Sequence, residues 1–125
     1  MPLDTNRPVF LDLLKIRLPV NAVVSILHRL TGAILVLLIP AMIYVLQLSL
    51  SGPEGFARAS DLLGAWPARV GAIILLWVLA HHLIAGIRFL AMDLDLGVGR
   101  PAFRRSAWAA LALAPVAAIL LGALL

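Results

Sequence analysis

Three long stretches of the chain carry no formally charged side chain. They are residues 30–53, residues 106–125, and residues 70–87, where two histidines are the only titratable groups. A helix that crosses the roughly 30 Å hydrocarbon core of a bilayer needs about 20 apolar residues. Apolar residues make up 63% of the 125 and charged residues only 13%, too few to give a soluble domain a polar surface. The sequence therefore predicts an all-α integral membrane protein with three transmembrane helices.

The expected domain is a transmembrane domain over residues 21–125, with helices at about 21–50, 66–91 and 104–125. Residues 1–20 form a cytoplasmic or interfacial segment, since charged residues interrupt their apolar ones, unlike the core of a signal peptide. The connection "SGPEGFARASDLLGAWPA" contains "PEGFARASDLL", which could form a short surface helix. Pro40 and Pro115 fall inside spans, where membrane helices tolerate them as kinks.

Lysines and arginines are divided unequally between the two sides of the predicted membrane. The side with the N-terminus and the second connection holds eight of the ten: Arg7, Lys15, Arg17, Arg29, Arg88, Arg100, Arg104 and Arg105. The first connection has only Arg58 and Arg69. The positive side usually faces the cytoplasm. We therefore expect a multi-pass protein of the bacterial inner membrane, with a cytoplasmic N-terminus and a periplasmic C-terminus.

Several chemistries have no residues to perform them. The chain has no cysteine, which excludes disulfides, thiolate metal sites and a cysteine nucleophile. Motifs for phosphate loops, zinc proteases and serine hydrolases are also absent. The net charge of +4 sits at the ends of apolar segments, so it indicates topology and a lipid partner rather than nucleic acid.

Ser25 and Arg29 are the first polar pair at a predicted membrane border. Four residues apart, they share a helix face, and a hydroxyl beside a guanidinium can hold a carbonyl or anionic oxygen. Alternatively, Arg29 reaches lipid phosphates and Ser25 only caps or packs. Spacing alone favours this second interpretation. Thr31 and Gly32, which follow directly, are best explained by close helix packing.

Two adjacent histidines lie inside the second span and cannot face the same partner. His82 lies about 9 Å of helix rise from Arg88 and shares a face with Gly86, which leaves room for a flat macrocycle. A neutral imidazole is a good ligand for haem iron. The alternative is a hydrogen-bonded packing histidine, which spacing alone favours.

Other charged residues could serve a haem at this depth. His28, Arg29 and Arg88 could together neutralise two haem propionates. Taken singly, each is explained as a charge at the end of a span that reflects membrane topology. Asp93 and Asp95 follow the second span; they are either solvated loop carboxylates paired with arginine, the favoured interpretation, or part of a proton relay beside a redox site.

Two separated motifs resemble one known family. "RPVFLDLLKIRLPVNAVVSILHRLTG" resembles the N-terminal signature of the cytochrome b556 subunit of succinate dehydrogenase, with its Ser-x-x-His-Arg-x-(Thr/Ser)-Gly. "HHLIAGIRFLAMDL" resembles the second-helix pattern His-x-x-x-Gly-Ile-Arg followed by an aspartate. "SGPEGFARASDLLG" is similar to the outer connection of the enterobacterial type. The resemblance covers nearly the whole chain and implies three helices packed with a second membrane anchor subunit.

The resemblance assigns roles to individual residues. It implies that Ser25 and Arg29 line the ubiquinone site and that His28 contacts a haem propionate. It implies that His82 is an axial ligand of haem b, while the partner membrane subunit supplies the other axial histidine. Asp93 would lie near the water path of the quinone pocket. The enterobacterial type has a histidine near a propionate where this chain has Phe89, and the role of His81 is unassigned.

The function implied is that of a haem b-binding membrane anchor of succinate dehydrogenase. Succinate would be oxidised on a flavoprotein subunit, and electrons would pass through an iron–sulfur subunit to ubiquinone, so this chain performs no dehydrogenase chemistry itself. The N-terminal segment would meet the iron–sulfur subunit. Two alternatives remain: an anchor of a fumarate reductase that uses menaquinol, and a cofactor-free structural protein with three helices.

Overall fold

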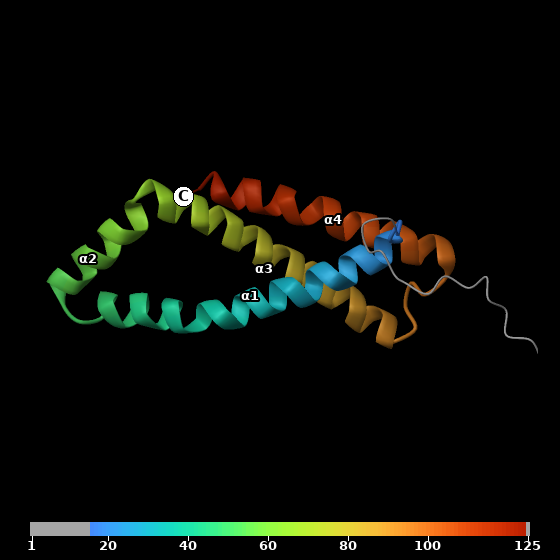
Figure 1. The fold of residues 1–125 in the computed structure, drawn as a ribbon, viewed down its shortest axis with the longest axis horizontal. Helices are drawn as coiled ribbons and strands as arrows, with labels where there is room; N and C mark the ends of the chain where they lie inside the picture. Colours follow the sequence, from blue (N-terminus) through green and yellow to red (C-terminus); the bar gives the residue numbers. More distant parts are fainter. Residues whose placement is uncertain (1–15, 125) are drawn as a thin grey trace, which may run out of the picture.

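The computed structural model describes residues 16–124, and every regular element in that range is a helix. The helices are α1 (Val20–Ser49), α2 (Pro53–Gly64), α3 (Trp66–Asp93) and α4 (Arg100–Gly122) (Figure 1). α1, α3 and α4 are each long and apolar enough to cross a membrane. The predicted all-α architecture with three candidate spans is thus confirmed. Most of the predicted segment 1–20 lies outside the described residues.

Prolines mark where the helices begin. α2, α3 and α4 each carry a proline in their first two positions, namely Pro53, Pro67 and Pro101. The backbone amides of the first turn have no acceptor within the helix, so the N–H that proline lacks is not needed there. The fixed φ of proline also suits a helix. For this reason α4 begins at Arg100, earlier than the expected start near residue 104. α2 covers the segment for which the sequence predicts a short helix.

α3 ends in a tight reversal. The Leu96 amide donates to the Ala91 carbonyl at 2.9 Å, and the Asp95 amide donates to the Met92 carbonyl at 2.9 Å. This pattern is a Schellman cap, which needs one residue in the left-handed conformation. Asp95 takes that position with φ 59°, because a short polar side chain tolerates it better than most. The cap leaves Asp93 at the exposed end of α3.

α3 and α4 lie side by side along most of their length, whereas α1 crosses α3 and then diverges from it (Figure 1). The buried residues of α4 are all alanines: Ala107, Ala110, Ala114 and Ala118. Small side chains let two membrane helices approach closely. Val24 of α1 and Ala85 of α3 pack against this stripe and form the core. The core therefore holds three helices together in the part of α1 that precedes its divergence.

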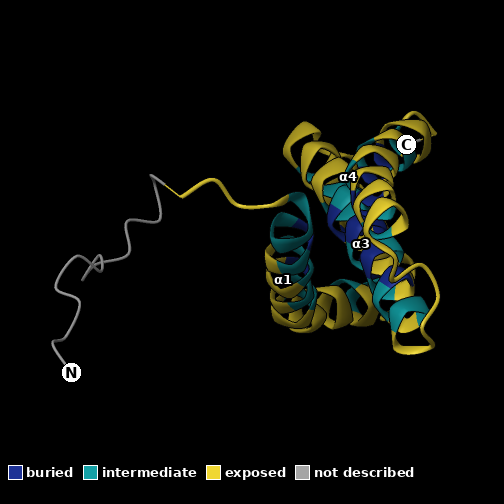
Figure 2. Ribbon diagram, turned by 90° about the vertical axis from the view of Figure 1, so that its right-hand side faces the viewer, coloured by how far each residue is buried: buried dark blue, intermediate teal, exposed yellow. Residues whose placement is uncertain are grey.

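Most of the apolar surface is left uncovered. Exposed residues cover the outer side of every helix, and buried ones form a narrow strip between them (Figure 2). In the apolar 18-residue stretch of each spanning helix, the buried share is only 11% in α1, 17% in α3 and 22% in α4. A surface this apolar suits contact with lipid or with other membrane helices rather than with water.

Candidate functional site

Two histidines from different helices meet where α1 crosses α3. The rings of His28 and His82 lie almost parallel, with centroids 4.2 Å apart and an interplanar angle of 5°. Phe89 meets the His28 ring at a steep angle, with centroids 5.2 Å apart. The sequence predicts only that the two histidines lie at similar depth. The structure brings them into direct contact.

One nitrogen of the His82 ring is anchored by the backbone of α1. Its Nδ1 lies 3.1 Å from the carbonyl oxygen of His28. A carbonyl can only accept, so Nδ1 carries the hydrogen in this bond. Among the residues that the structure describes, both polar contacts of the ring use Nδ1, which leaves the Nε2 lone pair available. Metal-bound histidines show this arrangement, with the second ring nitrogen donating to a carbonyl or carboxylate.

Two glycines make room for the stacked rings. A Cβ atom added at Gly32 would lie 2.9 Å from Cε1 of His82, and one added at Gly86 would lie 3.3 Å from Nε2 of His28. Each glycine therefore lies against the histidine of the opposite helix. The sequence predicts that Gly86 leaves space for a macrocycle. In the structure that space holds the His28 ring, because the crossing of α1 over α3 places it there.

Ser25 and Arg29 form a pair on α1. Nη2 of Arg29 donates a hydrogen bond to Oγ of Ser25 at 3.1 Å, which confirms that the four-residue spacing puts them on one face. Ser25 is half-buried and Arg29 is exposed. Within residues 16–124 the Ser25 hydroxyl has no acceptor of its own, so its hydrogen can be donated to a ligand and is polarised by the cation from which Ser25 accepts. The pair can thus offer several donors to one oxygen of a ligand.

Arg88 connects all three long helices, a role that the sequence does not predict. The side chain is only 7% exposed. It donates to Oδ1 of Asn21 at 2.7 Å, to Oγ of Ser106 at 2.9 Å and to the carbonyl of Phe103 at 3.0 Å. The sequence feature that could have indicated this role is the presence of Asn21 and Ser106 at the ends of otherwise apolar spans. These bonds compete with the predicted propionate contact of Arg88, which remains a prediction.

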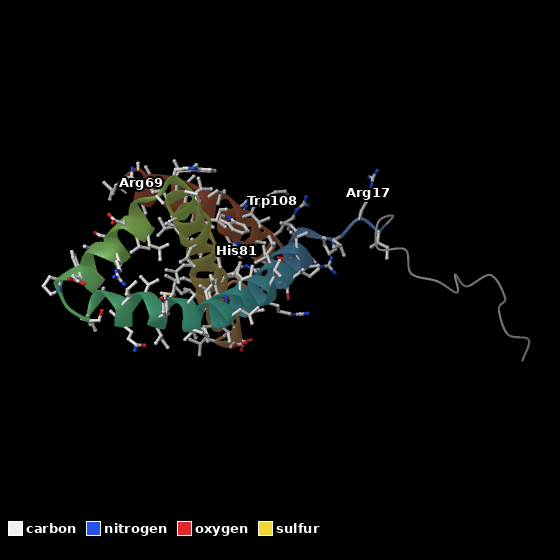
Figure 3. All side chains as sticks on the ribbon, turned by 60° about the vertical axis from the view of Figure 1, so that its left-hand side comes forward. Arg17, Arg69, His81 and Trp108 are labelled. Carbon is white, nitrogen blue, oxygen red and sulfur yellow. The ribbon has the colours of Figure 1, made fainter. Side chains whose placement is uncertain are left out.

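His81 lies in the interior of the bundle (Figure 3). It is 1% exposed, its ring stacks on Trp77 with centroids 5.8 Å apart, and its Nε2 has no hydrogen-bond partner in the described part of the chain. His82 instead contacts α1 through the bonds described above. The structure therefore separates the two adjacent histidines, as helical geometry predicts, and gives His81 a packing role.

Asp93 is not brought to these groups. It is the last residue of α3 and is exposed. Within residues 16–124, no hydrogen bond or ion pair joins it to Ser25, Arg29 or a histidine. The proton path through Asp93 therefore remains a prediction.

A separate groove of about 650 Å³ lies between α1, α2 and α3. Its lining is apolar apart from two serines: Ala41, Met42, Val45, Leu46, Ser49, Phe56, Ala59, Ser60, Leu63 and Leu75. It contains no titratable residue and none of the polar residues described above.

Comparison with known proteins identifies similar chains. The sequence model of the family described as succinate dehydrogenase/fumarate reductase transmembrane subunit matches residues 4–121. The succinate dehydrogenase cytochrome b556 subunit of Coxiella burnetii (strain RSA 493 / Nine Mile phase I) is 37% identical over 122 residues, which cover 96% of this chain and 97% of that protein. The subunit of the same name from Paracoccus denitrificans is 36% identical over 118 residues, covering 92% and 88% respectively.

Proposed function

This chain belongs to the succinate dehydrogenase/fumarate reductase transmembrane subunit family, and we propose that it is the haem b-binding membrane anchor of a succinate dehydrogenase. Electrons leave succinate on a flavoprotein subunit, pass through an iron–sulfur subunit and reach ubiquinone at a site that this chain helps to form. Both similar subunits are named for succinate dehydrogenase and for a b-type cytochrome, which supports this direction and this cofactor.

The observation that carries the haem assignment is the bond between Nδ1 of His82 and the carbonyl of His28, at 3.1 Å. Because this bond keeps the ring in one tautomer, Nε2 is the nitrogen that would hold the iron. His28, whose ring stacks on that of His82, is proposed to contact a propionate. A second membrane anchor subunit would supply another histidine to the haem. When bound, the haem would supply one-electron transfer.

The Ser25–Arg29 pair is proposed to bind ubiquinone. The hydroxyl of Ser25, which accepts from Arg29 at 3.1 Å, donates its own hydrogen to a quinone carbonyl. The guanidinium of Arg29, which its hydrogen bond holds beside Ser25, is proposed to stabilise the negative charge that develops on that oxygen as electrons arrive. Reduction to quinol consumes two electrons and two protons, and Asp93 with water is proposed to supply protons.

The proposed location is the bacterial inner membrane. The end of the bundle that holds the start of α1 and the α3–α4 connection would lie at the cytoplasmic face. Eight of the ten lysines and arginines belong to the N-terminal segment, the α3–α4 connection and their helix borders. That excess supports a cytoplasmic position for this end. The iron–sulfur subunit would dock there, close to Ser25 and Arg29.

The haem assignment is tested with the complex purified together with its partner subunits. His82→Ala should abolish the reduced b-type absorption band, because it removes the nitrogen that holds the iron. His81→Phe is the matched control, since it replaces the adjacent ring and should leave the band in place. An unchanged band in His82→Ala would contradict the assignment. A wild-type complex without any b-type band would favour the cofactor-free alternative.

The quinone assignment is tested by comparing two electron acceptors. Arg29→Ala should lower ubiquinone reduction about a hundred-fold, the scale for losing one donor that stabilises developing charge. Succinate oxidation with an artificial acceptor should not change. Arg104→Ala, which removes an exposed arginine of α4, should leave both rates intact. Equal loss of both activities in Arg29→Ala would mean that Arg29 is structural.

An anchor of a fumarate reductase that works with menaquinol is the second candidate. The family description covers both enzymes, and the two would share the fold and the haem ligand. The quinone extracted with the purified complex distinguishes them: ubiquinone supports the proposal, and menaquinone alone supports the alternative.

A further inference from the structure

Thr31 places a hydroxyl group inside the contact between α1 and α3. The residue is 1% exposed. Its Oγ1 lies 2.8 Å from the carbonyl of Leu27 and 3.0 Å from that of His28. The same oxygen lies 3.4 Å from Nδ1 of His82. Close packing explains the small size of Thr31, but it does not explain a hydroxyl at the anchored nitrogen of the proposed haem ligand.

The hydrogens in this cluster have one consistent arrangement. The hydroxyl of Thr31 donates to a carbonyl of the preceding turn, as threonines in helices often do, and keeps lone pairs on Oγ1. The N–H of His82 then faces two acceptors, the His28 carbonyl at 3.1 Å and Oγ1 of Thr31 at 3.4 Å. If Thr31 donated to Nδ1 instead, two acceptors would face each other at 3.1 Å, which is unfavourable in a buried contact.

We propose that Thr31 is a positioning residue for His82. Together with the His28 carbonyl, its hydroxyl holds the N–H of the ring and so fixes the tautomer and the ring orientation. Acceptors at the far nitrogen make a metal-bound imidazole more basic. A more basic ligand favours the oxidised iron, so Thr31 lowers the midpoint potential of the haem. The inference rests on the proposed function, because it takes His82 as the ligand.

Two features of the site make this hydrogen bond effective. Thr31 is almost fully buried, and a hydrogen bond in a medium of low dielectric constant is stronger than one in water. Gly32 follows directly and leaves the ring so close to α1 that a Cβ there would lie 2.9 Å from it. The sequence pair Thr-Gly therefore supplies the acceptor and the space that brings the ring to it.

The test compares variants in the complex purified with its partner subunits. Thr31→Val keeps a branched side chain of similar size but loses the hydroxyl, whereas Thr31→Ser keeps the hydroxyl. Ser49→Ala is the matched control, since the Ser49 hydroxyl also donates to a carbonyl of the preceding turn of α1, at 2.7 Å. Haem content is measured by absorbance, the midpoint potential by redox titration, and ligand orientation by the electron paramagnetic resonance signal of the ferric haem.

We expect Thr31→Val to retain the haem band, to raise the midpoint potential and to shift the ferric resonance signal. Thr31→Ser and Ser49→Ala should match the wild type in all three measurements. An unchanged potential and signal in Thr31→Val, with the haem band present, would overturn the role of Thr31 alone. Absence of the band from the wild-type complex would contradict the proposed function itself, and this inference with it.

Discussion

Three residues of α1 restrain the ring of His82, namely His28, Thr31 and Gly32. The His28 ring stacks on its face, with centroids 4.2 Å apart. The His28 carbonyl and Thr31 meet its Nδ1, and the backbone at Gly32 closes one side. A ligand that is held in place before binding loses less entropy when it binds. Neighbours of His82 should therefore affect the proposed haem binding, although none of them is a proposed ligand of the iron.

Gly32→Ala is the sharpest test of that idea. The added Cβ would lie 2.9 Å from Cε1 of His82, so the ring or the helix must shift. Inserting a methyl group into a packed contact typically costs about 1–3 kcal/mol. We expect a lower ratio of haem to protein in the purified complex and a lower unfolding temperature. Both are read from absorbance spectra recorded during heating.

Gly71→Ala provides the comparison for this change. It also adds a methyl group to a glycine of a spanning helix, but the new Cβ would have no packing neighbour within 4 Å among the described residues. Its haem ratio and unfolding temperature should match or exceed those of the wild type. A Gly32→Ala complex that behaves like Gly71→Ala would show that the ring does not need this space.

Among the elements, α3 is the helix to which the other two spans are attached. On one side His82 contacts the backbone of α1, and on the other the alanine face of α4 allows close packing. Near the C-terminal end of α3, Arg88 bonds to α1 and α4 at once. Apolar side chains of similar shape do little to fix the register of three packed helices. The Arg88 guanidinium donates to three acceptors, and these directional hydrogen bonds fix the register.

Arg88→Met should therefore loosen the bundle. Each hydrogen bond to a charged group contributes about 1.5–3 kcal/mol. The variant also removes a buried charge whose Nη1 has no partner among residues 16–124, and that offsets part of the loss. We expect a net destabilisation of about 2 kcal/mol. Unfolding of the complex in mixed detergent micelles measures it.

Arg100→Met is the control, since Arg100 is exposed at the start of α4. It should leave the unfolding midpoint unchanged. An Arg88→Met complex more stable than the wild type would mean that the cost of burying the charge exceeds the value of its three bonds.

Elements and single-helix faces could be read from the sequence, whereas contacts between helices could not. The length of the apolar stretches predicts three spans, and the spacing of Ser25 and Arg29 predicts their shared face. The stacking of His28 on His82 depends on where α1 crosses α3, and this is set by packing of the whole bundle. The bonds of Arg88 and the contact of Thr31 with His82 were missed for the same reason, because these partners lie far away in the sequence.

At the scale of the whole molecule, charge and apolar surface are arranged along the long axis. Arg17 and Arg69 lie at opposite ends of the structure (Figure 3), and the end with Arg17 belongs to the more positive side of the sequence. α1, with 30 residues, is about 45 Å long and exceeds the hydrocarbon thickness of about 30 Å. Its ends must therefore reach the interfacial regions, where arginines are tolerated.

The proposed orientation can be tested directly because the chain has no cysteine. Ala57 in α2 and Val98 in the α3–α4 connection are both exposed. A single cysteine introduced at either position reports one side of the membrane. Eight basic residues on one side against two on the other favour a cytoplasmic α3–α4 connection. A membrane-impermeant maleimide should therefore label Ala57→Cys in intact spheroplasts, and Val98→Cys only after the membrane is opened. The reverse pattern would place Ser25 and Arg29 at the periplasmic face, out of reach of an iron–sulfur subunit in the cytoplasm, and would refute the proposed electron route.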